Sequence, residues 1–227
     1  MPRYELLDPR KHGQLRLRSL GESEPHFARI VPGEFAMAAT SCPIMLTKDP
    51  ETGAFLIIAV LSLKPGESPL KSIKERCGIT PLALQCYGFY TTDEHIAIDR
   101  DNPRFSETEG EPLFTASLQP DDCLRQVQIG LGRLQAGDEA TAVFVQSLME
   151  LKLIEPIDMS LKFDDGEHLT LKGLYTVGVD ALREIEDAAA VRLFRAGHLE
   201  LVYLMATSLK QFEVLAHLRN QRLSRSS

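Results

Sequence analysis

The chain has no tryptophan, and aromatic residues make up only 7% of its 227 residues. A surface that stacks single-stranded nucleic acid needs exposed aromatic rings along a basic groove, and this composition makes such a surface hard to assemble. Basic residues are scattered rather than clustered, and the formal net charge is −7. We therefore expect no nucleic-acid-binding role.

Long apolar runs are also missing. The longest one, Ala54–Leu63, covers about ten residues, whereas a membrane-spanning helix needs about 20. The N-terminal segment carries charges throughout and has no apolar h-region, so it does not have the form of a secretory signal. These two features predict a cytoplasmic protein without a membrane span.

The four cysteines are few and widely spaced, at Cys42, Cys77, Cys86 and Cys123. They form no C-x-x-C pair and fit no common zinc pattern, so we expect reduced thiols and no metal. The segment Gly130–Leu134 lacks the preceding strand and the third glycine of a dinucleotide fingerprint. No Gly-x-Ser-x-Gly motif occurs either. The sequence therefore predicts no cofactor.

Apolar residues make up 44% of the chain and charged residues 25%, which are ordinary values for a globular protein. No internal repeat and no hydrophilic linker divides the chain. We expect a single domain over residues 1–227. Its predicted class is α+β, with a mostly antiparallel sheet, packed helices and a C-terminal helical subdomain.

Alternating and apolar segments predict the strands. Short strands are expected at Tyr4–Leu7, Gln14–Arg18, Phe89–Thr92 and His95–Asp99. Two hairpins are expected, one from Ile44–Thr47 and Phe55–Leu63 and the other from Ile154–Phe163 and His168–Leu174. Residues Arg100–Pro112 show no periodicity and are interpreted as a long loop.

Helical spacing and end signals predict the helices. A short helix of small residues should follow Pro32, and another helix is expected at Pro69–Cys77. Two helices separated at Gly137 are expected between Asp121 and Lys152. Further helices are expected at Val179–Ala196, which Gly197 would end, and at His198–Leu223.

The most distinctive stretch runs from Ile79 to Phe114. It holds a proline-containing apolar segment, an Ile98-Asp99 strand end and the sequence Gly110-Glu111-Pro112-Leu113-Phe114. Other features follow in order over roughly 190 residues, from His26-Phe27-Ala28 to Ser208-Leu209. In these features the chain resembles the SapC family of bacterial proteins.

The chain departs from that family at two places. Leu84-Gln85-Cys86 and Tyr87-Gly88-Phe89 stand where the family has a tryptophan and a basic-aromatic step before its Pro-Phe segment. Val179-Asp180 stands where an Asp-Glu pair is expected. The family carries no established activity to transfer. Its frequent genomic companions are flavin-dependent halogenase-like proteins, cupin-like proteins and outer-membrane receptors, so the resemblance implies an accessory role with a protein partner.

The leading hypothesis is therefore a non-catalytic cytosolic accessory or interaction protein of the SapC type. The alternative is an enzyme or enzyme subunit that acts on a peptide or an aromatic metabolite. It rests on His26 and Asp99 meeting in a cleft beside the Arg100–Pro112 loop. The candidate pocket residues are His26, Glu34, His95, Asp99, Arg104 and Glu111.

Each of these candidates also has a purely structural explanation. The two histidines can be hydrogen-bonded residues at strand ends, and the acidic loop can be a solvated surface. A salt-bridge clamp of Arg104 with Asp99 and Glu111 would order the loop without binding a substrate.

The C-terminal helix carries a broad apolar stripe that includes Met205, Leu209 and Phe212. Such a stripe belongs either to the core or to a partner groove. We expect a two-fold homodimer, since closed two-fold dimers are the commonest oligomers. The contact would use this helix or, as an alternative, a sheet edge near Leu15–Leu17.

Overall fold

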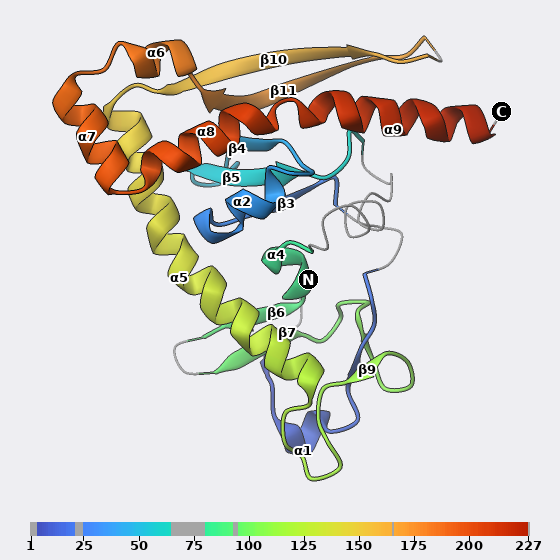
Figure 1. The fold of residues 1–227 in the computed structure, drawn as a ribbon. Helices are drawn as coiled ribbons and strands as arrows, with labels where there is room; N and C mark the ends of the chain where they lie inside the picture. The colour runs from blue at the N-terminus through green and yellow to red at the C-terminus, as the bar shows by residue number, and fades with distance from the viewer. Residues whose placement is uncertain (1–3, 21–24, 65–79, 93–94, 165, 227) are drawn as a thin grey trace. The chain divides into compact units, whose positions relative to one another are not determined.

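The computed structural model describes residues 4–20, 25–64, 80–92, 95–164 and 166–226 (Figure 1). The chain forms two compact units, and each is built from two separate stretches. Unit 1 comprises Met1–Glu24 and Thr80–Ala136, and unit 2 comprises Pro25–Ile79 and Gly137–Ser227. Antiparallel sheets and packed helices confirm the α+β class. A single domain over the whole chain stays a prediction, and the expected helix Pro69–Cys77 lies outside the described residues.

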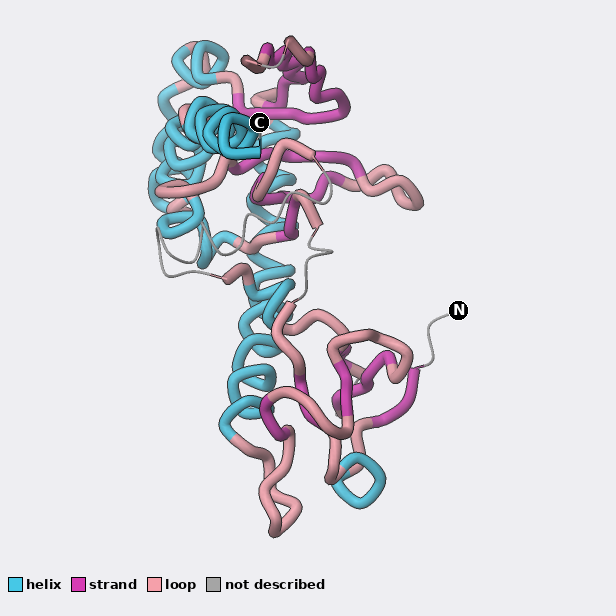
Figure 2. Tube along the Cα trace, turned by 90° about the vertical axis from the view of Figure 1, so that its right-hand side faces the viewer, coloured by secondary structure: helices cyan, strands magenta, loops and turns pink. Residues whose placement is uncertain are grey.

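Unit 1 is built around two small antiparallel sheets and consists mostly of loops and short strands (Figure 2). The first sheet has the order β1-β7-β6, with β1 at Tyr4–Leu6, β7 at Ile96–Asp99 and β6 at Phe89–Thr91. The second has the order β8-β2-β9, with β8 at Phe105–Ser106, β2 at Arg16–Leu17 and β9 at Glu111–Pro112. Two short helices accompany them, α1 (Pro9–His12) and α4 (Leu82–Gln85).

The core of unit 1 joins these sheets to helix α5 (Asp122–Glu150). Leu15 and Leu17 are buried there, as the alternation of their segment predicts. The other buried members come from β6, β7, β8, the residues after β9 and the first half of α5, and include Phe89, Ile98, Phe105, Leu113, Phe114, Leu124 and Val127.

Unit 2 holds a five-stranded antiparallel sheet in the order β10-β11-β4-β5-β3. Its strands are β3 (Phe27–Arg29), β4 (Ile44–Lys48), β5 (Phe55–Val60), β10 (Ile154–Lys162) and β11 (His168–Val177). Both predicted hairpins are confirmed as the pairs β4–β5 and β10–β11. Gly53 adopts a φ of 71° in the turn between β4 and β5, a conformation that favours glycine.

The helices of unit 2 are η1 (Pro32–Glu34), α2 (Phe35–Ala38), α6 (Val179–Arg183), α7 (Asp187–Arg195), α8 (His198–Ser208) and α9 (Gln211–Ser226). Figure 1 shows α8 and α9 following one another along the sheet. The end of α8 is tied to the start of β4 by the buried hydroxyl of Ser208. That oxygen accepts from the backbone N–H of Ile44 at 2.8 Å and donates to the carbonyl of Met205 at 2.7 Å.

The predicted break at Gly137 is wrong, because α5 is one helix of 29 residues. A Cβ atom built on Gly137 would lie 2.5 Å from the Cβ of Val31, which is closer than real Cβ atoms approach. The glycine is therefore required by close packing and does not end the helix. The loss of helix propensity, about 1 kcal/mol relative to alanine, is tolerated within a long helix.

Two other predicted helices are each split in the structure. Val179–Ala196 becomes α6 and α7, because Glu186 is extended with a ψ of 146° and begins α7 as its N-cap. His198–Leu223 becomes α8 and α9, with a turn at Leu209 and Lys210. The apolar stripe continues across that turn, which is why the sequence pattern does not show it.

The predicted loop Arg100–Pro112 is only partly a loop, since it contains β8 and β9. Both strands pair with β2, Leu17 lying opposite Phe105 on one side and Glu111 on the other. Two-residue strands are too short to show a period of two. Their partner is about 90 residues away in the sequence, so no local pattern could reveal the pairing.

Candidate functional site

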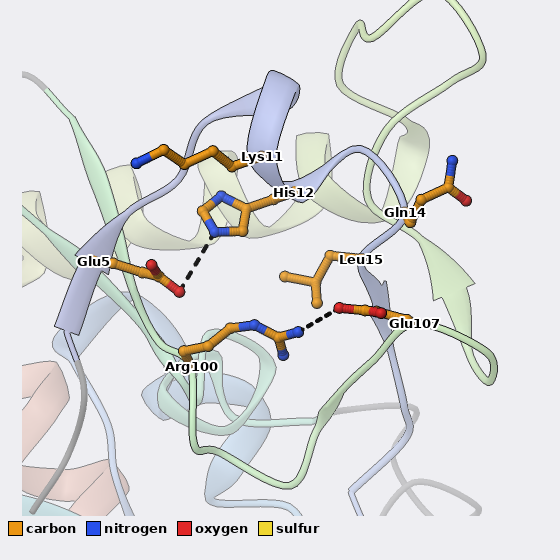
Figure 3. Close-up of a pocket in the computed structure, with 7 residues that line it drawn as sticks. All are labelled: Glu5, Lys11, His12, Gln14, Leu15, Arg100 and Glu107. Carbon is orange, nitrogen blue, oxygen red and sulfur yellow. Dashed lines mark hydrogen bonds and ion pairs between the residues drawn. The ribbon is translucent and has the colours of Figure 1, made fainter.

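A polar pocket in unit 1 has a volume of about 230 Å³ (Figure 3). Its walls come from β1, α1, the residues leading to β2 and the residues that follow β7 and β8. The lining residues are Glu5, Lys11, His12, Gln14, Leu15, Arg100 and Glu107. The pocket thus joins the N-terminal segment to the Arg100–Pro112 segment that the sequence singles out.

His12 is held in one orientation by backbone contacts. Asp8 caps α1, its carboxylate accepting from the N–H of Arg10 at 2.8 Å. The backbone N–H of Asp8 donates to Nδ1 of the buried His12 ring at 2.9 Å. Nδ1 is therefore an acceptor, and in the neutral ring the hydrogen is on Nε2. That N–H faces Oε1 of Glu5 at 3.5 Å.

The opposite side of the pocket is closed by an ion pair. The guanidinium of Arg100 donates to the carboxylate of Glu107 at 2.7 Å, and the Glu107 side chain is largely exposed. With Glu5 and Lys11, the lining holds two carboxylates and two cations. The pocket is therefore electrically balanced while His12 is neutral.

Arg104 does not form the predicted clamp with Asp99 and Glu111. Its buried guanidinium instead donates to backbone carbonyls, to Leu84, Gln85 and Tyr87 at 3.0 Å each and to Arg18 at 3.3 Å. Leu84 and Gln85 end α4, where carbonyl groups lack helical partners. Burial lowers the pKa of Arg104. Arg104 therefore has a structural role within unit 1, as the clamp interpretation expects. Its partners are backbone carbonyls instead of the carboxylates of Asp99 and Glu111.

Glu111 is an exposed residue of β9 that lies beside Cys123. Burial, followed by the charge of Glu111 and its hydrogen bond with the thiol, raises the pKa of Cys123 to about 11. Cys123 is thus a protonated thiol at neutral pH rather than a nucleophilic thiolate.

His26 and Glu34 belong to unit 2, whereas Asp99 belongs to unit 1. His26 precedes β3 and lines a mostly apolar pocket of about 210 Å³ with residues such as Ile58, Leu171 and Leu174. Burial lowers the pKa of His26. Glu34 accepts from the backbone N–H of Val31 at 3.1 Å and so caps η1. The meeting of His26 with Asp99 stays a prediction.

His95 precedes strand β7, and Asp99 is its last residue. A strand rises about 3.3 Å per residue, so residues four apart on one face are separated by about 13 Å. That separation is too large for one metal ion. Within the described residues, no three His, Cys, Asp or Glu side chains gather as a metal site would require. Asp99 accepts from the N–H of Asp101 at 3.2 Å, which shapes the turn after β7.

The outward face of sheet β1-β7-β6 is aromatic. Leu6, Ala97 and Tyr90 lie side by side across the three strands, and Tyr4 lies opposite Asp99. The Tyr4 and Tyr90 rings meet edge to face with centroids 4.9 Å apart. Burial, the contact with Tyr4 and the charge of Asp99 raise the pKa of Tyr90 to about 12.

This face remains open to solvent in spite of its apolar character. Tyr4 is 59% exposed, Leu6 54% and Tyr90 39%. Antiparallel sheets usually place polar residues on their solvent face. The sequence alone does not reveal this surface, because only the register of β1 against β7 shows that these residues share one face. Glu5 and His12 are not apparent from the sequence for a similar reason, although Asp8-Pro9 is typical of a helix start.

The predicted interface residues on α8 and α9 lie in the interior of unit 2. Met205 and Phe212 are buried, and Leu209 is partly buried against the same cluster as Phe212. That cluster also holds Met45 and Ile58 from the sheet. A homodimer stays a prediction, but these side chains are taken up by packing within the unit.

The family-like sequence around Gly110 has a structural explanation. Gly110 adopts a φ of 102°, and a Cβ atom there would lie 2.4 Å from the carbonyl oxygen of Leu17. Leu113 and Phe114 enter the core of unit 1, as does Ile98 of the strand end. These residues therefore serve the fold of unit 1.

The SapC family model matches residues 7–215 of the chain. No curated protein and no solved structure matches the chain. Within the described part of the chain, no helix combines the length and the apolarity needed to cross a bilayer.

Proposed function

Because the chain belongs to the SapC family, we propose that it is a cytosolic accessory protein that acts by binding a protein partner, without catalysis of its own. The observation that carries this proposal is the aromatic outward face of sheet β1-β7-β6. We call it the tyrosine face and define it by the exposed side chains of Tyr4, Leu6 and Tyr90, with Leu6 and Tyr90 on either side of the buried Ala97.

The tyrosine face has the chemistry of a protein-binding surface. Tyrosine is enriched at interfaces, where its ring supplies apolar area at low cost in conformational entropy and its hydroxyl can still be hydrogen-bonded. Energetic hot spots are rich in tyrosine as well. Tyr4 and Tyr90 already hold one another through their ring contact, so little ordering is left for a partner to impose.

Cys86 and Cys123 of unit 1 carry thiols and form no disulfide, which is compatible with the proposed cytosolic location. The Cys86 thiol donates to the carbonyl of Val127 at 3.7 Å, and Cys123 is a protonated thiol beside Glu111. By family resemblance, halogenase-like and cupin-like companions are the first partners to examine.

Affinity capture from native lysate tests this role. The unmutated protein is compared with the double variant Tyr4→Ser/Tyr90→Ser and with Tyr203→Ser, which changes a tyrosine that is 50% exposed on α8 of unit 2. We expect one partner that is captured by the unmutated protein and the Tyr203 variant and lost with the double variant. Equal capture by all three proteins, or capture of no partner, contradicts the proposal.

A second candidate is an enzyme or enzyme subunit that acts on a peptide or an aromatic metabolite. The observation in its favour is the polar pocket, where the fixed His12 N–H faces the Glu5 carboxylate. Turnover of a small molecule by the pure protein would support it if Glu5→Gln abolished the activity. Glu109→Gln is the matched control, because Glu109 pairs with Arg18 and does not line the pocket.

A further inference from the structure

We infer that the polar pocket of unit 1 binds a small zwitterion of the α-amino-acid class, with its ammonium group at Glu5 and its carboxylate at Arg100. This inference does not depend on the proposed protein partner, because none of the residues that define the tyrosine face lines the pocket.

The balance of charges in the pocket selects for a zwitterion. A simple anion would be attracted by Lys11 and Arg100 but would lie among the carboxylates of Glu5 and Glu107, and a simple cation would meet the reverse problem. In Figure 3 the Lys11 side chain extends away from the guanidinium of Arg100. The two cations therefore do not converge on one anion, whereas a ligand with both charges can satisfy Glu5 and Arg100 together.

Glu5 is prepared to accept a cation. His12 engages one of its two oxygens, and the His12 ring is fixed by the backbone N–H of Asp8. A carboxylate held in this way keeps acceptor capacity for an ammonium group without a large ordering cost. The Glu5 side chain is largely buried, so this attraction is less screened than at an exposed site.

Arg100 can take a second carboxylate. A guanidinium has five N–H donors, and only one contact, with Glu107, is formed across this pocket. Glu107 is largely exposed, and exposed ion pairs contribute little, about 0–1 kcal/mol. A ligand carboxylate can therefore share or displace Glu107 at small cost.

The size of the pocket limits the ligand. Its volume of about 230 Å³ lies below the range of roughly 300–1,000 Å³ that is typical for drug-sized ligands. Leu15 supplies an apolar wall and the His12 ring a flat one. A small amino acid with a short aliphatic side chain fits these walls better than a long peptide does.

Equilibrium dialysis with radiolabelled glycine, L-alanine and L-valine tests the inference. Acetate and methylamine, which each carry one of the two charges, are the comparison ligands. We expect saturable binding of at least one amino acid at millimolar concentration or below, and binding at least tenfold weaker for acetate and methylamine. Loss of one charged hydrogen-bond partner should weaken binding roughly ten- to a hundredfold in Glu5→Gln and in Arg100→Gln.

Matched variants keep the test decisive. Glu109→Gln and Arg18→Gln remove the members of a neighbouring ion pair outside the pocket and should leave the affinity unchanged. Circular dichroism and thermal melting check that every variant is folded. Failure of all three amino acids to bind at 10 mM overturns the inference. Acetate binding as tight as amino-acid binding, or equal effects of pocket and control variants, also overturns it.

Discussion

Gly137 of helix α5 lies so close to Val31 that a methyl group in place of its hydrogen would overlap the Val31 side chain, 2.5 Å from its Cβ. Glycine at the middle of a long helix is usually a cost. Here it permits the second half of α5 to approach the segment between β3 and η1, and Arg29 at the end of β3 also pairs with Asp138.

The first prediction follows from this contact. Gly137→Ala should destabilise the protein by roughly 1–3 kcal/mol, the usual cost of overpacking, in spite of its better helix propensity. Gly132→Ala is the control, since a Cβ there meets nothing within 4 Å. It should stabilise the protein by up to about 1 kcal/mol. Urea unfolding followed by circular dichroism measures both, and equal signs for the two variants would refute the packing argument.

Arg104 should be a stability determinant of unit 1. Arg104→Met keeps most of the apolar stem but leaves the carbonyls of Leu84, Gln85 and Tyr87 without their donor. We expect a loss of about 2–4 kcal/mol, because unsatisfied buried acceptors cost about 1–3 kcal/mol. Arg183→Met, at an exposed ion pair with Asp180, should cost less than about 0.5 kcal/mol. Comparable losses in the two variants would contradict the assignment.

A substitution at Phe212 distinguishes packing in the core from a contact in a dimer. It is 2% exposed and packs against Met45 and Ile58, so Phe212→Asp should unfold or aggregate the chain. Phe194→Asp changes a residue of α7 that is 72% exposed and should leave the protein folded. Size-exclusion chromatography with light scattering reads both outcomes. A folded, monomeric Phe212 variant of a dimeric parent would assign Phe212 to an interface instead.

His198 should make stability fall in mild acid. The ring is buried against Phe144, and burial lowers its pKa. As the pH falls, the unfolded chain takes up its proton first, near the ordinary value of about 6.5. The contribution of His198 to the free energy of unfolding is therefore fully present above that value. It is lost as the pH falls toward the lowered pKa of the folded state. His198→Gln should reduce the loss of stability between pH 7 and pH 5, measured by urea unfolding, and an unchanged slope would dismiss His198 as a cause.

Much of the secondary structure could be predicted from local patterns. Both long hairpins and the short strands near Tyr4 and Leu15 follow from periodicity and turn residues. For the C-terminal stripe the pattern leaves two alternatives, the core and a partner groove, and cannot decide between them. The features that could not be predicted depend on contacts between segments that are distant in the sequence. The pairing of β8 and β9 with β2, the role of Gly137 and the carbonyl partners of Arg104 all require knowledge of which segments meet.

The candidate site shows the same limit. The sequence directs attention to the Arg100–Pro112 segment, and two of its residues do line the polar pocket. It could not supply Glu5 and His12, which reach the pocket only because β1 pairs with β7. Nor could it show that Tyr4 and Tyr90 share a face, since their strands lie on opposite sides of β7.

The pairing of β1 with β7 has a consequence for biosynthesis. Tyr4 lies opposite Asp99, so the first strand cannot find its partner until about 95 further residues have been made. At roughly 5–20 residues per second, the ribosome needs about 5–20 s for that stretch. During this interval the nascent segment presents Tyr4, Leu6, Leu15 and Leu17 without their sheet, which makes it a natural target for a chaperone.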